Sequence, residues 1–185
     1  MKTKMIIVAA PSGAGKSSFV ERLATEDSRI HDVITYTTRM MRHNESHGKP
    51  YFFISKEEFE KKIKEGFFVE WARVHTSLYG TSYEQIQLAW VRGKAVIMDI
   101  DIQGVVTFKS KYPEAKTVFI LPPSICELRR RVIKRDGGAP ADLEIRMINA
   151  EKEMLKANEF DVQIVNDDFN RSYAEFKEIV EKWIT

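Results

Sequence analysis

The stretch Ala10-Pro11-Ser12-Gly13-Ala14-Gly15-Lys16-Ser17 decides the fold of this 185-residue chain. It follows the apolar run Met5-Ile6-Ile7-Val8-Ala9, which is typical of a buried strand, and it precedes residues 18–23, whose apolar spacing favours a helix. A strand, a glycine-rich turn and a helix in this order form the context of a phosphate-binding loop. The glycines let backbone N–H groups curl around phosphate oxygens, and the helix N-terminus adds a partial positive charge.

Two side chains of this phosphate loop (residues 10–17) carry its expected chemistry. Lys16 is expected to reach the β- and γ-phosphates, and the hydroxyl of Ser17 is expected to ligate Mg²⁺. Ala10 stands where the general pattern has its first glycine. The alternative is a glycine-rich turn without a ligand, which the complete Gly15-Lys16-Ser17 end makes much less favoured.

The composition describes an ordinary globular protein. With 43% hydrophobic and 30% charged residues, the chain is expected to form one domain. The net charge of +2 argues against a general nucleic-acid binder, and no apolar run is long enough to span a membrane. The single cysteine, Cys126, excludes an internal disulfide and is expected to be a buried thiol. A reducing cytoplasm is the predicted location.

Apolar runs alternate with helical patterns along the chain. The strand candidates are Met5–Ala10, Phe67–Trp71, Ala95–Asp99, Thr117–Leu121 and Val162–Val165. Several are continuously apolar, which is typical of parallel strands covered on both faces. The pattern predicts an α/β doubly wound fold, a mainly parallel sheet flanked by helices with the phosphate loop after the first strand.

Helix boundaries are also marked. A capping-box pattern predicts helix starts at Ser55, Ser82 and Ser124, and glycines predict helix ends at Gly66 and Gly93. Apolar spacing predicts a last helix over residues 171–184.

Two segments interrupt the alternation. Residues 35–54 are polar and rich in arginine and histidine. Residues 135–142 contain Asp136-Gly137-Gly138-Ala139-Pro140, a loop flanked by arginines. In a phosphate-loop protein, such a loop suggests a lid that closes over a nucleotide.

Acidic side chains follow the predicted strand 95–99. Residues two apart in a strand point to the same face, so Asp99, Asp101 and Gln103 are expected to converge at the carboxyl end of the sheet, where open α/β sheets bind ligands. The alternative is that these groups are helix caps or solvated, with Asp101 capping the next helix.

A second anion site is a further expectation. Arg39 and Arg42, with Tyr51 and Tyr79, are suited to hold another phosphate, and a solvated basic loop is an equally weighted alternative. Glu70 lies inside the apolar run Phe67-Phe68-Val69-Glu70-Trp71, where a carboxylate must be paired or must serve a ligand. Pairing with an arginine and binding a ligand are equally weighted.

These residues coincide with the motifs of a known family, in order along the chain. The matching stretches are Ala10-Pro11-Ser12-Gly13-Ala14-Gly15-Lys16-Ser17-Ser18, Thr37-Thr38-Arg39-x-x-Arg42, Glu45-x-x-Gly48-x-x-Tyr51-Phe52-Phe53, Phe68-Val69-Glu70-Trp71-Ala72, Tyr79-Gly80-Thr81, Asp99-Ile100-Asp101-Ile102-Gln103-Gly104, Ile120-Leu121-Pro122-Pro123-Ser124 and Ile164-Val165-Asn166-Asp167-Asp168. The chain resembles the bacterial guanylate kinases over nearly its whole length. The resemblance implies a phosphate-loop nucleoside monophosphate kinase fold, with a core (1–34, 82–123 and 147–185), a GMP-binding segment (35–81) and a lid (124–146).

The resemblance also implies an activity and residue roles. The activity is transfer of the γ-phosphoryl group of ATP, the co-substrate, to GMP or dGMP, with Mg²⁺ held by Ser17 and waters. The partners implied are the nucleotides ATP and GMP, with no nucleic acid and no membrane. The implied GMP-binding residues are Thr35, Glu70, Thr81 and Asp99 around the guanine, Arg39, Arg42, Tyr51 and Tyr79 on the phosphate, Glu45 supporting that loop, and Asp101 and Gln103 near Mg²⁺-bound water. The implied ATP-binding residues are Ser12, Gly13, Ala14, Gly15, Lys16, Ser17, Ser18 and Asn166, and the implied catalytic residues are Lys16, Arg39, Arg131, Arg135 and Arg146.

The chemistry of the bases agrees with these roles. Guanine presents N1–H and N2–H₂ donors side by side, which one carboxylate accepts as a pair, whereas adenine leaves a buried Glu70 half-paired. One departure from the family pattern is the lid run Lys134-Arg135-Asp136-Gly137-Gly138, where Gly-Arg-Gly is usual. Two other functions are considered: a related kinase of another phosphorylated acceptor, and a non-enzymatic phosphopeptide-binding module. The first leaves the base-reading residues without a base, and the second is disfavoured by Lys16 and Ser17.

Overall fold

A computed structural model describes residues 4–43, 45–74 and 76–185 of the chain. Its strands are β1 (Met5–Ala9), β2 (Ile30–Asp32), β3 (Tyr36–Thr37), β4 (Ser46–His47), β5 (Pro50–Phe53), β6 (Phe68–Val74), β7 (Ser77–Ser82), β8 (Ala95–Asp99), β9 (Lys116–Leu121) and β10 (Val162–Val165). Its helices are α1 (Lys16–Glu26), α2 (Lys56–Lys64), α3 (Tyr83–Val91), α4 (Ile102–Lys111), α5 (Ile125–Asp136), α6 (Leu143–Met154), the 3₁₀ turn η1 (Ala157–Glu159) and α7 (Phe169–Ile184).

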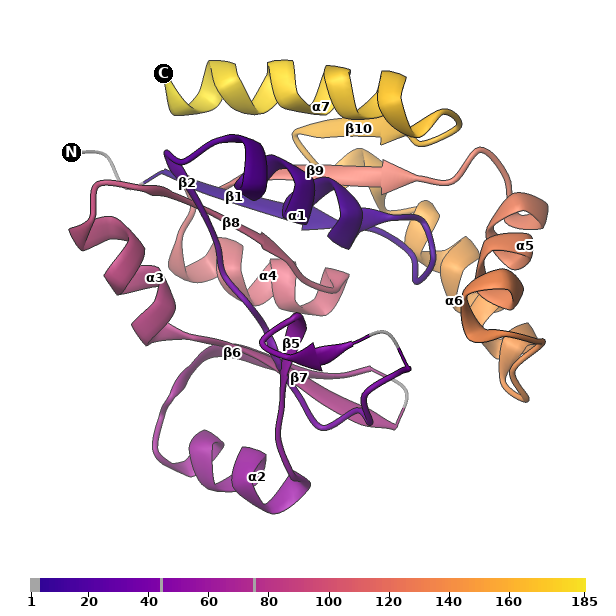
Figure 1. Cartoon of the computed structure of the whole chain (residues 1–185), viewed down its shortest axis with the longest axis horizontal. Coiled ribbons are helices and arrows are strands. Elements are labelled where there is room, and N and C mark those ends of the chain that lie inside the picture. Colours follow the sequence, from indigo (N-terminus) through magenta and orange to yellow (C-terminus); the bar gives the residue numbers. More distant parts are fainter. Residues whose placement is uncertain (1–3, 44, 75) are drawn as a thin grey trace.

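The main sheet is parallel throughout and has the order β10-β9-β1-β8-β2. The central strand β1 is buried along its whole length, with Ile6 and Val8 on one face and Ile7 and Ala9 on the other. This alternation places helices on both faces, as the apolar runs predicted. Figure 1 shows α7 above the sheet and α3 and α4 below it. Helix α1 also packs on the α7 face, where Phe19 meets Phe176 edge-to-face with ring centroids 5.4 Å apart.

A second, mixed sheet holds residues 36–82 in the order β4-β5-β3-β7-β6. Strand β7 pairs antiparallel with β3 and β6, whereas β5 pairs parallel with β3 and β4. The predicted strand 67–71 therefore belongs to this sheet and not to the parallel one. Helix α2 covers it through Phe59, which stacks on Phe68 with ring centroids 4.5 Å apart. Gly80 permits this contact, because a Cβ there would lie 3.0 Å from both rings.

The predicted lid, residues 124–146, covers α5 and the first turn of α6, which lie at the right of Figure 1. Leu128 and Val132 of α5 and Met147 of α6 are buried in the same core cluster as β1 and α1. Helices α5 and α6 are thus anchored to the main sheet by apolar packing, and residues 137–142 connect them.

The capping serines and the glycines predicted most of the helix starts and ends correctly. Ser55 and Ser124 each accept a hydrogen bond from the backbone N–H three residues on, at 3.1 Å. Ser82 occupies the N-cap position of α3, but its side chain accepts from Gln85 Nε2 and makes no capping bond to the backbone. Gly66 and Gly93 follow their helices with φ of 67° and 71°, the left-handed region that glycine favours.

Two expectations need correction. Helix α7 begins at Phe169, two residues before the predicted start, because Asp168 accepts from the backbone N–H of Arg171 at 2.9 Å and caps it. Cys126 is exposed and not buried, because it lies on the outer side of α5 while Leu128 and Val132 face the core. Among the described residues, no helix combines the length and the apolar character needed to cross a membrane.

Candidate active site

The phosphate loop lies between β1 and α1, at the carboxyl end of the central strand. Gly13 and Gly15 have φ of 98° and 103°, values that disfavour side chains with a Cβ. Gly15 is also the N-cap of α1 and offers no side chain to cap it, so the first N–H groups of the helix are left for a ligand. The loop therefore has the conformation that an anion-binding turn requires.

Asn166, at the end of β10, braces this loop. Its Nδ2 donates to the carbonyl of Ala14 at 2.8 Å, and its own carbonyl accepts from Arg131 at 2.9 Å. Asn166 is buried, so the side-chain amide faces the loop backbone. A Cβ on Gly15 would lie 2.8 Å from that amide nitrogen, which is a second reason for glycine at this position.

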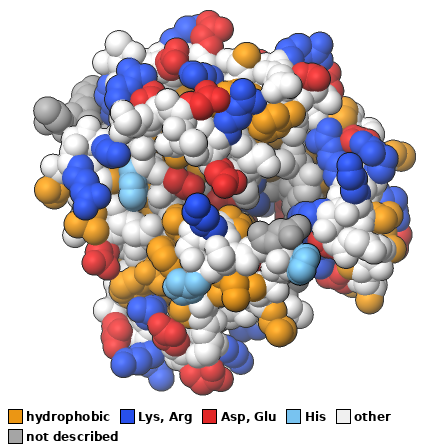
Figure 2. Space-filling view, in the orientation of Figure 1, with side chains coloured by type: hydrophobic (Ala, Val, Ile, Leu, Met, Phe, Trp, Pro, Cys, Tyr) orange, Lys and Arg blue, Asp and Glu red, His pale blue; other side chains and the backbone are white. Residues whose placement is uncertain are grey.

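A cavity of about 490 Å³ opens beside the phosphate loop, between the main sheet and the second sheet. Figure 2 shows the surface hollowed here, with acidic and basic side chains at its border. The structure brings most of the predicted site residues to this cavity: Ser12, Gly13, Gly15, Lys16, Ser17, Ser18, Thr35, Arg39, Arg42, Glu45, Tyr51, Glu70, Tyr79, Asp99, Asp101, Arg131, Arg135 and Asn166. The predicted residues Ala14, Thr81, Gln103 and Arg146 do not line it.

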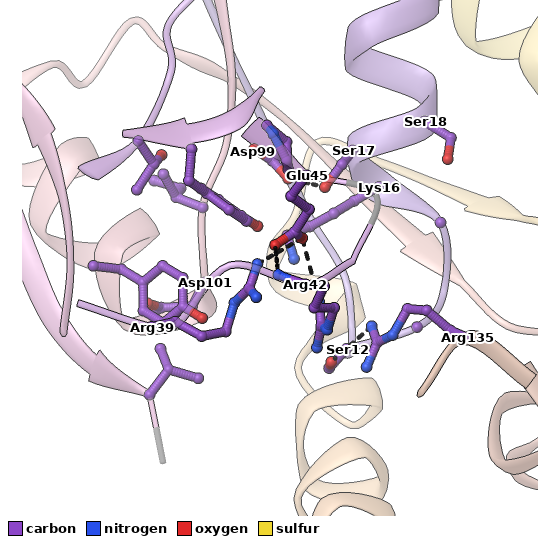
Figure 3. Close-up of a pocket in the computed structure, with 18 of the residues that line it drawn as sticks. Ser12, Lys16, Ser17, Ser18, Arg39, Arg42, Glu45, Asp99, Asp101 and Arg135 are labelled. Carbon is purple, nitrogen blue, oxygen red and sulfur yellow. Dashed lines mark hydrogen bonds and ion pairs between the residues drawn. The ribbon is translucent and has the colours of Figure 1, made fainter. Parts of the chain in front are cut away.

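Lys16, Ser17 and Asp99 meet at the inner end of the cavity (Figure 3). The hydroxyl of Ser17 donates to the carboxylate of Asp99. Burial raises the pKa of Asp99, while the charge of Lys16 and the Ser17 hydrogen bond act in the opposite direction. A hydroxyl and a carboxylate are the hard oxygen ligands that Mg²⁺ takes together with waters and phosphates. The donor set therefore fits the predicted magnesium ion.

Asp101 and Gln103 do not continue the strand geometry that predicted their convergence. The strand ends at Asp99, and Asp101 is the N-cap of α4, where its carboxylate accepts from the backbone N–H of Gly104 at 2.9 Å. Asp101 thus fits both alternatives, since it caps the helix and also lines the cavity. Gln103 is exposed on α4, because the helical turn carries it away from the face of Asp99.

Glu70 is buried on β6 and faces the cavity. Thr81 Oγ1 on the neighbouring strand β7 donates to Glu70 Oε1 at 2.8 Å. No arginine lies within ion-pair distance of Glu70 in the part of the chain that the structure describes, so pairing with an arginine is excluded there. Burial is the main cause that raises the pKa of Glu70 to about 7. Thr81 therefore does not line the cavity itself and acts by holding the Glu70 carboxylate through this hydrogen bond.

The hydroxyl of Thr35 is a second polar group on this side of the cavity. Its Oγ1 is buried and has no hydrogen-bond partner among the described residues. A buried hydroxyl without a partner is costly, and a polar ligand would satisfy it. Thr35 and Glu70 together offer a donor and an acceptor to a planar polar group.

Arg39 and Arg42 lie at the mouth of the cavity and are ordered by Glu45 (Figure 3). Glu45 accepts from Arg39 Nη2 at 2.7 Å and from the backbone N–H of Arg42 at 2.8 Å. Burial alone would raise the pKa of Glu45, but the bonds from Arg39 and Arg42 lower it overall. Arg39 also lies over the ring of Tyr51, 5.4 Å from its centroid. Arg39 and Arg42 are therefore held by Glu45 in a partly buried basic cluster, which favours the predicted anion site over a solvated loop.

The rings of Tyr51 and Tyr79 continue this wall. Their centroids are 5.7 Å apart and their planes are nearly perpendicular. Burial raises the pKa of the Tyr51 hydroxyl, and the charge of Asp99 adds to the rise. Tyr51 thus keeps its proton and can donate it to a ligand.

Two arginines of the predicted lid, Arg131 and Arg135, reach the cavity from α5. Arg131 Nε pairs with Glu127 at 2.8 Å, and Arg135 Nη1 donates to Ser12 Oγ at 3.4 Å. Arg146, on α6, pairs with Asp142 at 2.9 Å and with Asp136 at 3.2 Å. Two of the three predicted lid arginines therefore line the cavity, and the third is held just behind them.

Some residues at the site were not found from the sequence. Ile100 and Phe169 line the cavity as apolar wall, and no pattern distinguishes them from core residues. Glu153 of α6 lines a neighbouring cavity together with Asp101, and burial raises its pKa to about 7. Asp136 forms ion pairs with Arg42, Arg135 and Arg146. The sequence did not indicate these contacts, because two of the partners come from other segments of the chain.

A parallel sheet with a phosphate loop, facing arginines from a second sheet across one cavity, defines a phosphate-loop kinase with an acceptor site of its own. Residues 2–183 match the family model described as guanylate kinase. The guanylate kinase of Bdellovibrio bacteriovorus is 68% identical over 181 residues, which cover 98% of this chain and 98% of that one. The guanylate kinase of Polaromonas sp. is 46% identical over 95% of this chain and 85% of its own length.

A solved structure agrees with these relatives. The crystal structure of guanylate kinase from Anaplasma phagocytophilum has a TM-score of 0.81 at 27% identity, and the match covers 97% of this chain and 85% of that chain. The chain belongs to the guanylate kinase family, whose activity is phosphorylation of GMP by ATP.

Proposed function

We propose a division of labour among the cavity residues by which this chain transfers the γ-phosphoryl group of ATP to GMP, and equally to dGMP. The acceptor nucleotide occupies the side of the cavity formed by the second sheet, and ATP occupies the phosphate loop. The observation that carries this arrangement is the buried carboxylate of Glu70 in the same cavity as Lys16.

Glu70 reads the guanine base. Its carboxylate accepts from N1–H and N2–H₂ together, and Thr81 holds one carboxylate oxygen through the 2.8 Å hydrogen bond. Thr35 supplies its unpartnered hydroxyl to the same base. Adenine has no donor at N1 and no amino group at C2, so it would leave Glu70 unpaired and be rejected. No residue in this set needs a ribose 2′-hydroxyl, which supports use of dGMP.

Arg39 and Arg42 hold the phosphate of GMP, with the hydroxyls of Tyr51 and Tyr79 as further donors. Guanidinium groups match phosphate oxygens with two parallel hydrogen bonds. Glu45 keeps both arginines in place before GMP arrives, through its 2.7 Å and 2.8 Å contacts. This preorganisation reduces the entropy lost on binding and aims the acceptor oxygen at ATP.

Lys16 and the phosphate-loop N–H groups hold the ATP phosphates. Ser17, with Asp99 behind it and Asp101 nearby, would hold a magnesium ion, which when bound neutralises charge on the β- and γ-phosphates. The transfer needs in-line placement, neutralised charge and exclusion of water. Arg131 and Arg135 supply positive charge from the lid, with Arg146 behind them, and closure of the lid excludes water that would hydrolyse ATP. Asn166 fixes the phosphate loop against β10, close to the predicted adenine position.

A coupled assay with ATP and Mg²⁺ tests the proposal on GMP, dGMP, AMP, CMP, UMP and a ribose bisphosphate. We expect efficient use of GMP and dGMP and poor use of the others. A kcat/KM for AMP close to that for GMP would contradict the role of Glu70, and preference for the ribose bisphosphate would favour the other kinase considered above. A reaction that consumes ATP in this way favours the cytoplasm as the location, which fractionation of cells would test.

A further inference from the structure

Asp136, the last residue of α5, lies where three arginines from different parts of the chain meet. Arg135 Nε is 2.9 Å from its Oδ1, Arg146 Nη1 is 3.2 Å from its Oδ2, and Arg42 Nε is 3.6 Å from its Oδ1. The carboxylate side chain is only 14% exposed. Of these partners, Arg135 and Arg146 belong to the lid helices, and Arg42 belongs to the segment before β4.

The helix end and the ion pairs together fix the position of the carboxylate. Gly137 terminates α5 with φ of 72°, and the backbone N–H of Gly138 donates to Ile133 at 3.0 Å. This left-handed cap stops the helix directly after Asp136. The ion pairs with the arginines and the low exposure of the side chain hold the carboxylate in place.

The arginines would repel one another without it. The Nε atoms of Arg42 and Arg135 lie 3.6 Å and 2.9 Å from the same oxygen of Asp136, and burial and then the charge of Arg135 lower the pKa of Arg42. Burial would raise the pKa of Asp136, but Arg135, Arg42 and Arg146 together lower it. Asp136 is thus the carboxylate shared by three converging positive charges, with Glu45 also 3.7 Å from Arg42 and Asp142 also 2.9 Å from Arg146.

We propose that Asp136 is a positioning residue that sets the phosphate-binding arginines of both substrate sites, Arg42 for GMP and Arg135 and Arg146 for the triphosphate. The inference rests on the proposed function, because it takes the roles of these arginines from there. Asp136 touches no phosphate itself. It holds the guanidinium groups at one point between the lid and the second sheet, so that neither substrate has to gather them against their mutual repulsion.

The lid offers a matched control. Glu144 of α6 pairs with Arg129 of α5, so Glu144→Gln removes one carboxylate charge and one interhelical ion pair from the same two helices. Its side chain is 72% exposed, and neither Glu144 nor Arg129 lines the cavity. Asp136→Asn and Glu144→Gln therefore remove the same charge, but only Asp136→Asn removes it next to the arginines proposed to bind phosphate.

The experiment measures KM for GMP and KM for ATP in the wild type, Asp136→Asn, Asp136→Glu and Glu144→Gln. We expect Asp136→Asn to raise both KM values by about tenfold, the scale on which misplaced positioning groups act. Asp136→Glu restores most of both losses, because it returns the charge, and Glu144→Gln leaves both values within about twofold, as for exposed ion pairs. Melting curves establish that each variant is folded, and Asp136→Ser replaces Asp136→Asn if the latter is not.

A double-variant cycle with Arg42→Lys separates this inference from the proposed function. Arg42→Lys should raise KM for GMP alone. Adding Asp136→Asn should then raise KM for ATP but leave KM for GMP unchanged, because the positioned group is already lost. Unchanged KM values in folded Asp136→Asn overturn the inference, and lowered values do so too, since they mean that the carboxylate competes with phosphate. If Arg42→Lys itself leaves KM for GMP unchanged, the proposed role of Arg42 fails and the inference falls with it.

Discussion

The side-chain amide of Asn166 donates a 2.8 Å hydrogen bond to the carbonyl of Ala14, although 152 positions separate the two residues in the chain. The bond fastens the phosphate loop, just before its junction with α1, to the residue that follows β10. A glycine-rich loop is conformationally free in isolation, so its binding shape depends on such outside contacts. The packing of Gly15 against the same amide explains why a side chain is not tolerated there.

Replacing Asn166 by alanine tests this bracing. The Ala14 carbonyl would lose its buried partner, so we expect a loss of about 1–3 kcal/mol in the free energy of unfolding. KM for ATP should rise, while calorimetric binding of GMP alone should stay near the wild-type value. Asn158→Ala, at an exposed position of η1, is the control and should cost less than about 0.5 kcal/mol. Equal losses for ATP and GMP would mean that Asn166 serves only the general fold.

Lys16→Ala should separate catalysis from acceptor binding. Lys16 acts on the ATP phosphates, so its loss should raise the barrier by about 3–4 kcal/mol or more, as for other charge-stabilising groups. GMP binding, measured by calorimetry without ATP, should be largely kept because the acceptor site lies on the second sheet. Lys64→Ala, on the solvent side of α2, controls for the loss of a lysine charge. A folded Lys16→Ala protein with near-normal kcat would remove the phosphate loop from the mechanism.

Glu70→Gln tests base recognition. The amide keeps the shape of the side chain but turns one acceptor oxygen into a donor, which then opposes N1–H or N2–H₂ of guanine. GMP binding should weaken by roughly 2–3 kcal/mol, the cost of an unpaired buried polar group. AMP should lose far less, so the ratio of kcat/KM for GMP to that for AMP should shrink. Equal losses for both nucleotides would show that Glu70 is structural.

The raised pKa of Glu70 predicts a pH dependence with opposite signs for stability and binding. The pKa rises from 4.5 to about 7 in the folded protein because of burial, with Asp101 adding to the rise and Thr81 and Lys111 opposing it. The unfolded chain therefore releases this proton first, so stability falls as pH rises from about 4.5 to about 7. GMP binding should strengthen over the upper part of that window, because the carboxylate is the form that accepts both donors.

The measurement compares wild type with Glu70→Gln from pH 5.5 to 8, by melting curves and by KM for GMP. Asp32 and Glu153 have pKa values raised to about 7 as well, so they contribute to the decline in stability of both proteins. The difference between the two proteins isolates Glu70. Parallel profiles for both would show that another group causes the pH dependence.

Strands β1, β8, β9 and β10 of the main sheet could be predicted because they are largely apolar runs, which are recognisable without their neighbours. In the second sheet only β6 could be predicted, because β3, β4 and β5 are short and mostly half-exposed or exposed, and their pairing depends on segments that are distant in sequence. The edge strand β2 of the main sheet was missed because only one of its three residues is buried. Hydrophobic patterns along the chain therefore predict most of the main sheet but little of the second sheet, which carries the proposed acceptor site.

Prediction of single site residues also depended on local sequence patterns. Lys16 and Ser17 could be predicted because they complete the phosphate-loop motif, and Glu70 because it is a carboxylate inside an apolar run. Gln103 was placed with Asp99 by strand alternation, and the placement is wrong because the chain turns into α4 after two residues. Asp136 carried no sequence signal beyond a departure from the family pattern, because its partners come together only in three dimensions.

The last prediction concerns movement of the two segments that flank the cavity. The predicted GMP-binding segment (35–81) and lid (124–146) carry arginines that face each other, and each substrate brings phosphates that attract them from its own side. Closure should therefore be greatest with both nucleotides, or with a bisubstrate analogue that joins them. GMP alone should draw in only its own segment.

Cys126 makes this movement measurable, because it is exposed on α5 and is the only cysteine in the chain. Met40→Cys adds a second label on the other segment, at a side chain that is 88% exposed. Energy transfer between dyes at the two positions should increase from the free protein to the GMP complex and again with both nucleotides. A pair at Cys126 and Val106→Cys, on the exposed face of α4 in the core, reports lid movement alone and should change only when ATP or the bisubstrate analogue binds. Identical transfer in all states for both pairs would mean that residues 124–146 form a fixed surface, and exclusion of water would then require a different part of the chain.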